Sequence, residues 1–112
     1  MDCIFCKIAS GEIPATKVYE DEEIIAFEDI SPKAPVHVLI IPRKHLATLN
    51  DAGPDQGALI GRIVLKAAGL ARDRGVAEKG YRVLVNCNQD GGQEVFHLHF
   101  HLLGGRRLKG MG

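Results

Sequence analysis

The chain has 112 residues, of which 46% are hydrophobic, so it is long enough for one compact domain, spanning residues 1–112, and too short for two. Its 14 basic residues balance its 14 acidic residues, which excludes a bulk electrostatic attraction to nucleic acid or to an anionic membrane. An anionic ligand must therefore be held by a local site.

The N-terminal segment MDCIFCKIAS lacks the basic region, long apolar run and small-residue cleavage site of a leader peptide, and no run of about 18 apolar residues follows. We therefore expect a cytoplasmic protein. The cysteines are too few for a disulfide framework, and the pair Cys3-x-x-Cys6 indicates metal binding or redox chemistry in a reduced compartment. Residues Ile4 to Ala9 can form a short helix that ends before Gly11 and Pro14.

Three short strands are expected in the next part of the chain. TKVYE and EEIIAFED predict two strands joined by the acidic turn Asp21-Glu22. The loop SPKAP should be rigid, because its two prolines cannot donate to a sheet. The β-branched run Val36–Pro42 is bounded by prolines and is too short for a helix, so it is the third strand.

One long helix is predicted after NDAGPD, where an acidic or Asn side chain can cap the free amides. Four apolar residues then keep helical spacing, Leu59, Ile63, Ala67 and Leu70, and the helix should end near Gly75. YRVLVN and EVFHLHFHLL follow as strands on either side of the turn CNQDGG. These elements predict an α+β fold, in which one long helix and a short N-terminal helix accompany a mostly antiparallel sheet of about five strands.

In the last of these strands, His97, His99 and His101 occupy every second position. Side chains alternate across a strand, so the three imidazoles should share one face, and the intervening residues should pack on the core: Phe96, Leu98, Phe100 and Leu102. Three alternating histidines need polar partners that an ordinary core does not supply, which argues against a purely structural role. The residues alone leave two interpretations open, a metal site and a site that handles a phosphate.

Four segments resemble those of one family in the same order: CIFCKIASGEIPATKVYEDE, FEDISPKAPVHVLIIPRKH, GYRVLVN and GGQEVFHLHFHLLGG. On these segments, which cover nearly the whole chain, the sequence resembles the Hint-like branch of the histidine triad family. The resemblance implies a histidine triad fold whose sheet extends across a homodimer. It also implies a purine nucleotide substrate, an adenosine 5′-phosphoramidate or an aminoacyl adenylate, which is hydrolysed to AMP through a covalent nucleotidyl-histidine.

The resemblance assigns catalytic roles to four histidines. The middle histidine of the triad attacks the α-phosphorus in this family, which makes His99 the nucleophile. Its other nitrogen should donate to the main-chain carbonyl of His97. A neighbouring imidazole, such as that of His101, can protonate the leaving amine, and His37 should support the triad by hydrogen bonding.

The resemblance also predicts where the nucleoside binds. Asp29 matches the carboxylate that accepts hydrogen bonds from the ribose hydroxyls. The apolar slot for the purine ring matches four residues that would otherwise be assigned to the core: Phe5, Ile8, Phe27 and Ile30.

Three further residues lie around the predicted phosphate site. Asn86 and Gln93 match positions that contact the phosphate or the leaving group, with turn stabilisation as the alternative. Glu94 stands where some family members have serine, and its carboxylate can favour leaving groups that carry a cationic amine. The C-terminal segment GGRRLKGMG lacks the tryptophan that some members extend toward the partner subunit, so their leaving-group selectivity does not transfer to this chain.

Some bacterial members with Cys-x-x-Cys bind structural zinc, and the resemblance implies the ligands Cys3, Cys6, His45 and His97, two sulfurs and two imidazole nitrogens. Such a zinc ion is not required for the chemistry. If His97 is a ligand, proton donation falls to His101 or to water. The alternative is that the cysteines are packed thiols, as we expect for Cys87.

Three alternative functions remain open. A dinucleoside polyphosphate hydrolase shares the triad, and it would act faster on diadenosine polyphosphates than on phosphoramidates. A non-catalytic nucleotide-binding scaffold protein would bind nucleotide with negligible turnover. A zinc hydrolase that uses the three histidines as ligands would lose its activity to a chelator, whereas covalent histidine chemistry needs no metal in the chemical step.

Overall fold

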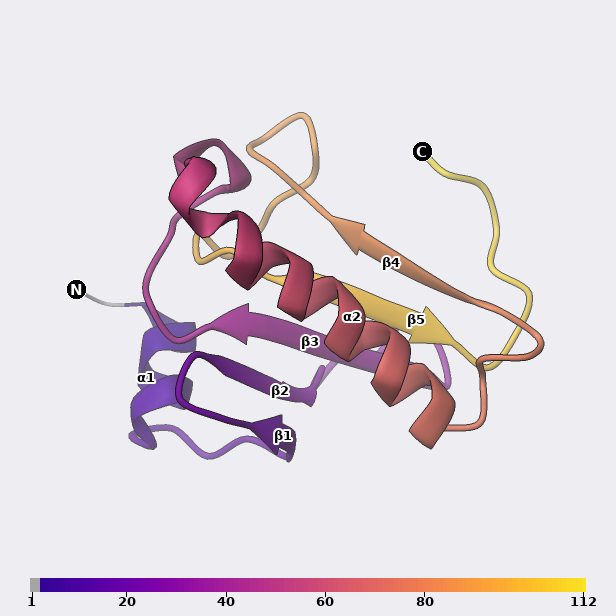
Figure 1. The fold of residues 1–112 in the computed structure, drawn as a ribbon. Helices are drawn as coiled ribbons and strands as arrows, with labels where there is room; N and C mark the ends of the chain where they lie inside the picture. Colours follow the sequence, from indigo (N-terminus) through magenta and orange to yellow (C-terminus); the bar gives the residue numbers. More distant parts are fainter. Residues whose placement is uncertain (1–2) are drawn as a thin grey trace.

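The computed structural model describes residues 3–112 (Figure 1). Its helices and short 3-10 turns are α1 (Ile4–Ser10), η1 (Leu49–Asp51), η2 (Pro54–Gln56) and α2 (Gly57–Asp73). Its strands are β1 (Lys17–Glu20), β2 (Ile24–Glu28), β3 (Val36–Pro42), β4 (Tyr81–Val85) and β5 (Phe100–Gly104). Within this described part of the chain, every helix is too short or too polar to cross a membrane.

The five strands form one antiparallel sheet in the order β1-β2-β3-β5-β4. The middle strand β3 is bonded on both sides, since Val38 lies opposite Glu28 of β2 and Leu102 of β5. All seven residues of β3 are buried. The predicted α+β fold, with one long helix, a short N-terminal helix and a five-stranded sheet, is confirmed.

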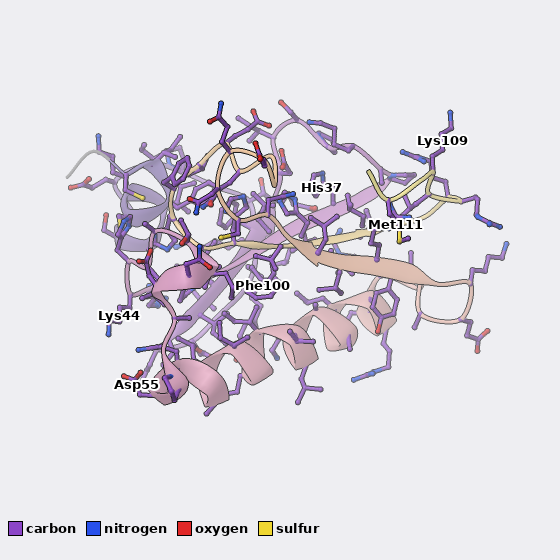
Figure 2. The ribbon with its side chains drawn as sticks, turned by 90° about the horizontal axis from the view of Figure 1, so that it is seen from above. His37, Lys44, Asp55, Phe100, Lys109 and Met111 are labelled. Atoms are coloured by element: carbon purple, nitrogen blue, oxygen red, sulfur yellow. The ribbon has the colours of Figure 1, made fainter. Side chains whose placement is uncertain are left out.

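The alternation of side chains along β3 divides the core into two layers. Val38 and Ile40 belong to the cluster that α2 covers, whereas Leu39 belongs to a second cluster that contains residues of α1. Helix α2 runs across one face of the sheet (Figure 1). Figure 2 shows Phe100 between the sheet and α2, and His37 on the opposite side of the sheet. We call this opposite side the α1 face.

Helix α2 carries the apolar stripe that the sequence predicts. Ile63 and Ala67 are completely buried and Leu70 is buried in the same cluster. The expected helix cap is wrong, because Gln56 takes the N-cap position and its side chain makes no capping hydrogen bond. The segment NDAGPD contributes instead to η1 and η2, and its proline opens η2. Proline has no amide hydrogen that would need a cap.

The last strand is shorter than the predicted Glu94–Leu103, since β5 begins only at Phe100. In the antiparallel register of β3 and β5, Leu98 would lie opposite Pro42. A proline nitrogen has no hydrogen to donate to the ladder. The N–H of Leu98 donates instead to the carbonyl of Leu46 at 2.6 Å, so this segment follows the loop after β3.

The predicted burial of Phe96 is wrong, because 47% of its surface is exposed. Residues 95–97 form a bend outside the sheet, and the alternation of buried side chains begins only after that bend. Leu98, Phe100 and Leu102 are buried in the cluster under α2, as predicted.

Candidate active site and metal cluster

Four histidines gather on the α1 face of the sheet. His37 comes from β3 and His101 from β5, whereas His97 and His99 come from the extended segment before β5. The ring centroid of His101 lies 5.0 Å from that of His99 and 5.2 Å from that of His37. His97 and His99 both contact the ring of Phe5 from α1. The predicted face of imidazoles therefore exists, although only His101 of the triad belongs to a paired strand.

The hydrogen bond predicted for His99 is present, since its Nδ1 lies 2.7 Å from the carbonyl oxygen of His97. A carbonyl can only accept, so Nδ1 carries the hydrogen and the lone pair of the neutral ring is on Nε2. Burial lowers the pKa of His99 below its ordinary value. The residue therefore presents a neutral, directed nitrogen nucleophile at neutral pH.

A chain of hydrogen bonds fixes the tautomers of the other two rings. The main-chain N–H of Lys33 donates to Nδ1 of His37 at 3.0 Å, so a neutral His37 carries its hydrogen on Nε2. That nitrogen lies 3.0 Å from Nδ1 of His101, which must accept. The hydrogen of a neutral His101 is then on Nε2, the nitrogen that does not face His37.

Burial keeps this pair of rings uncharged. It is the main cause that lowers the pKa of His101 to about 4, and the nearby His99 and His37 rings lower it further. Burial also lowers the pKa of His37, against the opposing effect of the Asp29 carboxylate. At neutral pH the site therefore offers uncharged imidazoles rather than imidazolium ions.

Asp29 stands at the edge of this group. Its Oδ1 accepts from the main-chain N–H of Ser31 at 2.7 Å, which holds the turn after β2. Its Oδ2 lies 3.5 Å from Nε2 of His37, and 19% of its side chain is exposed. One carboxylate oxygen is thus tied to the backbone, while the other faces both the histidines and solvent.

The four residues of the predicted purine slot do not all lie together. Phe5, Ile8 and Phe27 are buried in the cluster of the α1 face, whereas Ile30 is 95% exposed. The ring of Phe5 lies 5.1 Å from that of His99 and 5.4 Å from that of Phe27, edge to face in both cases. The structure therefore brings Phe5 to His99 and to Phe27, and leaves Ile30 exposed on the surface beside Asp29.

Asn86 and Gln93 both hold the turn between β4 and β5. Asn86 Nδ2 donates to the carbonyl of Gly91 at 2.6 Å. The amide of Gln93 donates to the carbonyls of Ala47 and Val95, and its oxygen accepts from the main chain. Both side chains therefore have the turn-stabilising role that the sequence allows, and their contact with a phosphate stays a prediction.

Glu94 is exposed and lies near Cys3 and His45. It lines a depression of about 480 Å³ together with Cys3, His45 and Phe96. Its predicted action on a leaving group stays a prediction.

The predicted metal ligands converge closely. Nδ1 of His97 lies 3.3 Å from Cys3 Sγ, 3.5 Å from Cys6 Sγ and 3.2 Å from Nδ1 of His45. Cys6 Sγ lies 3.4 Å from the same His45 nitrogen. A tetrahedral zinc ion separates two nitrogens by about 3.3 Å and a nitrogen from a sulfur by about 3.5 Å, given its usual bond lengths. The donor set therefore fits zinc in both composition and spacing.

The tautomer of His97 also suits a metal ligand. Its Nε2 lies 2.8 Å from the carbonyl oxygen of Pro42, which can only accept, so Nε2 carries the hydrogen. The lone pair on Nδ1 is then directed at the cysteines. Such an outer hydrogen bond is how a metal-bound imidazole is usually oriented.

The three histidines of the triad do not form one metal site. Within residues 3–112, the donor groups close enough to share an ion are the cluster of Cys3, Cys6, His45 and His97, and a second group of Asp29, His37 and His101. In the second group the facing nitrogens of His37 and His101 are already joined by a hydrogen bond. The arrangement therefore does not favour a zinc hydrolase with the triad as ligands.

Two groups that direct these rings were not predicted. They are the main-chain N–H of Lys33 and the main-chain carbonyl of Pro42. Both are backbone groups, so the pattern of side chains in the sequence does not predict them. Pro35, just before β3, and Pro42, its last residue, are sequence features that lie near these two backbone groups.

The HIT domain family profile matches residues 10–108. The chain is 50% identical to the purine nucleoside phosphoramidase of Escherichia coli (strain K12) over 107 residues, which are 96% of this chain and 90% of that protein. Among solved structures it is similar to a HIT family hydrolase from Legionella pneumophila Philadelphia 1, with a TM-score of 0.95, 56% identity and 96% of each chain covered.

A Zn-bound histidine triad family protein from Mycobacterium smegmatis is also similar. It superimposes with a TM-score of 0.82 at 34% identity, covering 95% of this chain and 76% of that one.

Proposed function

The chain belongs to the histidine triad family of nucleotide hydrolases, and from that premise we propose that it hydrolyses purine nucleoside 5′-phosphoramidates through a covalent nucleotidyl-histidine on His99. The hydrogen bond of 2.7 Å from Nδ1 of His99 to the carbonyl of His97 carries this proposal. It leaves the second ring nitrogen, Nε2, with its lone pair available for attack on phosphorus. The relative named purine nucleoside phosphoramidase supports the same substrate class.

In the first step, Nε2 of His99 attacks the α-phosphorus and the P–N bond breaks, so the nucleotide is carried on the histidine and the amine departs. His101 has a pKa of about 4 and one hydrogen on Nε2. At neutral pH we therefore assign it a hydrogen bond to the departing amine, whose additional proton comes from solvent. In the second step, water attacks phosphorus, AMP leaves, His99 is restored and the proton returns to solvent.

The nucleophile is tested with a fluorogenic adenosine phosphoramidate, using the wild type, His99→Ala and His99→Gly. We expect turnover to fall by about 10³-fold or more in both variants, because the covalent route is lost. Rapid mixing followed by intact mass measurement should show a transient adduct of one nucleotide in the wild type alone. Full activity in either variant would contradict the assignment.

We further propose that the Cys/His cluster holds a structural zinc ion through Cys3, Cys6, His45 and His97. A bound zinc ion supplies a cross-link between α1, the loop after β3 and the triad segment, and it adds stability to a small fold. Replacement by cobalt(II) should give the absorption of a tetrahedral site with two thiolate ligands. The spectrum should vanish in Cys3→Ser and persist in Cys87→Ser, because Cys87 lies outside the cluster.

The exposed edge of β4 supports the homodimer that the family resemblance implies. Within residues 3–112, β4 pairs with β5 on one side only, and Tyr81 at its start is 38% exposed. An unpaired edge offers a row of backbone groups to another strand. Sedimentation of the wild type should give twice the chain mass, and a proline in place of Val83 should reduce it if β4 forms the contact.

A further inference from the structure

His97 belongs to two sites at once. Its ring nitrogen Nδ1 lies within the Cys/His cluster, 3.3 Å from Cys3 Sγ. Its main-chain carbonyl accepts the hydrogen bond that fixes the tautomer of His99. The bond from its Nε2 to the carbonyl of Pro42 leaves the ring little freedom to turn. A change in the cluster that moves His97 must therefore change the support of His99.

Phe5 provides a second connection between the cluster and the nucleophile. In the sequence it lies between Cys3 and Cys6. Cys3 is the N-cap of α1, and its Sγ accepts a hydrogen bond from the main-chain N–H of Cys6 at 3.3 Å. The ring of Phe5 packs edge to face against His99 at 5.1 Å and against His97 at 6.0 Å. The cysteine ligands thus determine where α1 begins and where its phenylalanine meets the nucleophile.

The loop that carries His45 provides a third connection. The next residue, Leu46, is buried, and its carbonyl accepts from the N–H of Leu98 at 2.6 Å. Leu98 stands between His97 and His99, in a segment that the sheet does not hold. This segment is therefore held by the loop and by the cluster instead of by a strand ladder.

From these three connections the geometry points to Cys3, Cys6 and His45 as positioning residues for His99. A metal ion in the cluster locks residues 97–99, so that the Nε2 lone pair of His99 stays directed into the site. This inference rests on the proposed role of His99 as nucleophile. Without a cation, the two imidazole nitrogens 3.2 Å apart and the adjacent sulfurs would be joined only by hydrogen bonds, of which those of the thiols are weak, so the ligands would separate more easily.

Loss of the metal should affect the chemical step more than the binding of nucleotide. Removal of the metal should slow formation of the nucleotidyl-histidine by about tenfold or more, the order of effect expected when a hydrogen bond that orients a reacting group is lost. The affinity for AMP should fall by a smaller factor, because Asp29 is held by the main-chain N–H of Ser31 and faces His37, which is not a ligand in the cluster.

The experiment compares zinc-loaded wild type, chelator-treated wild type, Cys3→Ser and Cys87→Ser. The depression lined by Cys3 and His45 gives a chelator access to the cluster. Three quantities are measured for each sample: the single-turnover rate of adduct formation, the AMP dissociation constant by calorimetry, and the ¹⁵N chemical shifts of the His99 imidazole. Circular dichroism at the assay temperature establishes that each sample is folded.

We expect the chelated protein and Cys3→Ser to lose rate and to show a His99 spectrum averaged over both tautomers, while Cys87→Ser matches the wild type. Addition of zinc should restore the chelated wild type but not Cys3→Ser. Equal rates and equal His99 spectra in folded protein with and without metal would overturn the inference. If the zinc-loaded wild type forms no adduct, the proposed function fails, and the His99 spectra alone then decide whether the cluster positions this ring.

Discussion

The buried ring of His101 should make the fold less stable in acid. Its pKa is about 4 in the folded protein and about 6.5 in an unfolded chain. The unfolded chain therefore binds the proton more tightly, so this contribution to stability is complete above about pH 6.5 and is lost as the pH falls toward 4. At about 1.36 kcal/mol for each pKa unit, the loss at pH 4.5 is at most about 2.5 kcal/mol, and the partial exposure of the ring reduces it to about 2.

Urea unfolding followed by circular dichroism measures this loss. The comparison is between the wild type and His101→Gln, whose amide oxygen can still accept from His37, at about pH 7 and about pH 4.5. Because the carboxylates titrate alike in both proteins, the free energy of unfolding should fall by about 2 kcal/mol more in the wild type. Parallel losses in the two proteins would refute the argument, since they would mean that burial does not suppress protonation of His101.

Three further predictions concern other parts of the structure. If Asp29 accepts from the ribose hydroxyls, as the family resemblance implies, Asp29→Asn should raise KM for an adenosine phosphoramidate by about tenfold and change KM for its 2′-deoxy analogue much less, because the diol would lose an anionic acceptor. Ile63→Ala should lower the free energy of unfolding by about 2–4 kcal/mol, because Ile63 is completely buried. The control Leu65→Ala lies on the same helix at a site that is 72% exposed, and it should change this free energy by less than about 0.5 kcal/mol. Gly91→Ala should lower the melting temperature, because a Cβ there would lie 2.5 Å from the main-chain oxygen of Cys87 in the same turn. Gly61→Ala in α2 should raise it, because alanine has the higher helix propensity and its Cβ would meet no atom within 4 Å beyond the adjoining turns of the helix.

Patterns of side chains predicted most of the fold. The apolar spacing from Leu59 to Leu70 predicted the face that α2 buries, and the β-branched run Val36–Pro42 predicted the middle strand to the residue. The predicted start of the last strand was wrong, because the length of a strand also depends on the neighbouring strand that it pairs with. Phe96 has strand-like alternation, but the neighbouring strand has ended at Pro42, and no ladder is left for it to join.

In the candidate site too, the side chains were predicted and most of the contribution of the backbone was not. The resemblance predicted which histidines gather and which residues surround the cysteines, and the structure places both groups within contact. Neither the alternation nor the resemblance predicted that Lys33 and Pro42 select the ring tautomers. Those bonds come from backbone groups in the loop before β3 and at its last residue, and the direction of these groups depends on the folded chain rather than on side-chain identity. Exposure at Ile30 was missed because an apolar residue in a turn has no periodicity to place it.

Acid sensitivity and nucleophilicity are two consequences of the same burial. A histidine attacks phosphorus only when it is neutral, and the burial that lowers the pKa of His99 favours the neutral ring. The same burial, acting on His37 and His101, favours the unfolded chain once the medium supplies protons. A substitution that opened the site to water would raise all three pKa values. It would therefore make the fold more tolerant of acid while moving the acid limb of kcat/KM to higher pH. The pH profiles of stability and of activity should thus shift in opposite directions in any variant that opens the site to water.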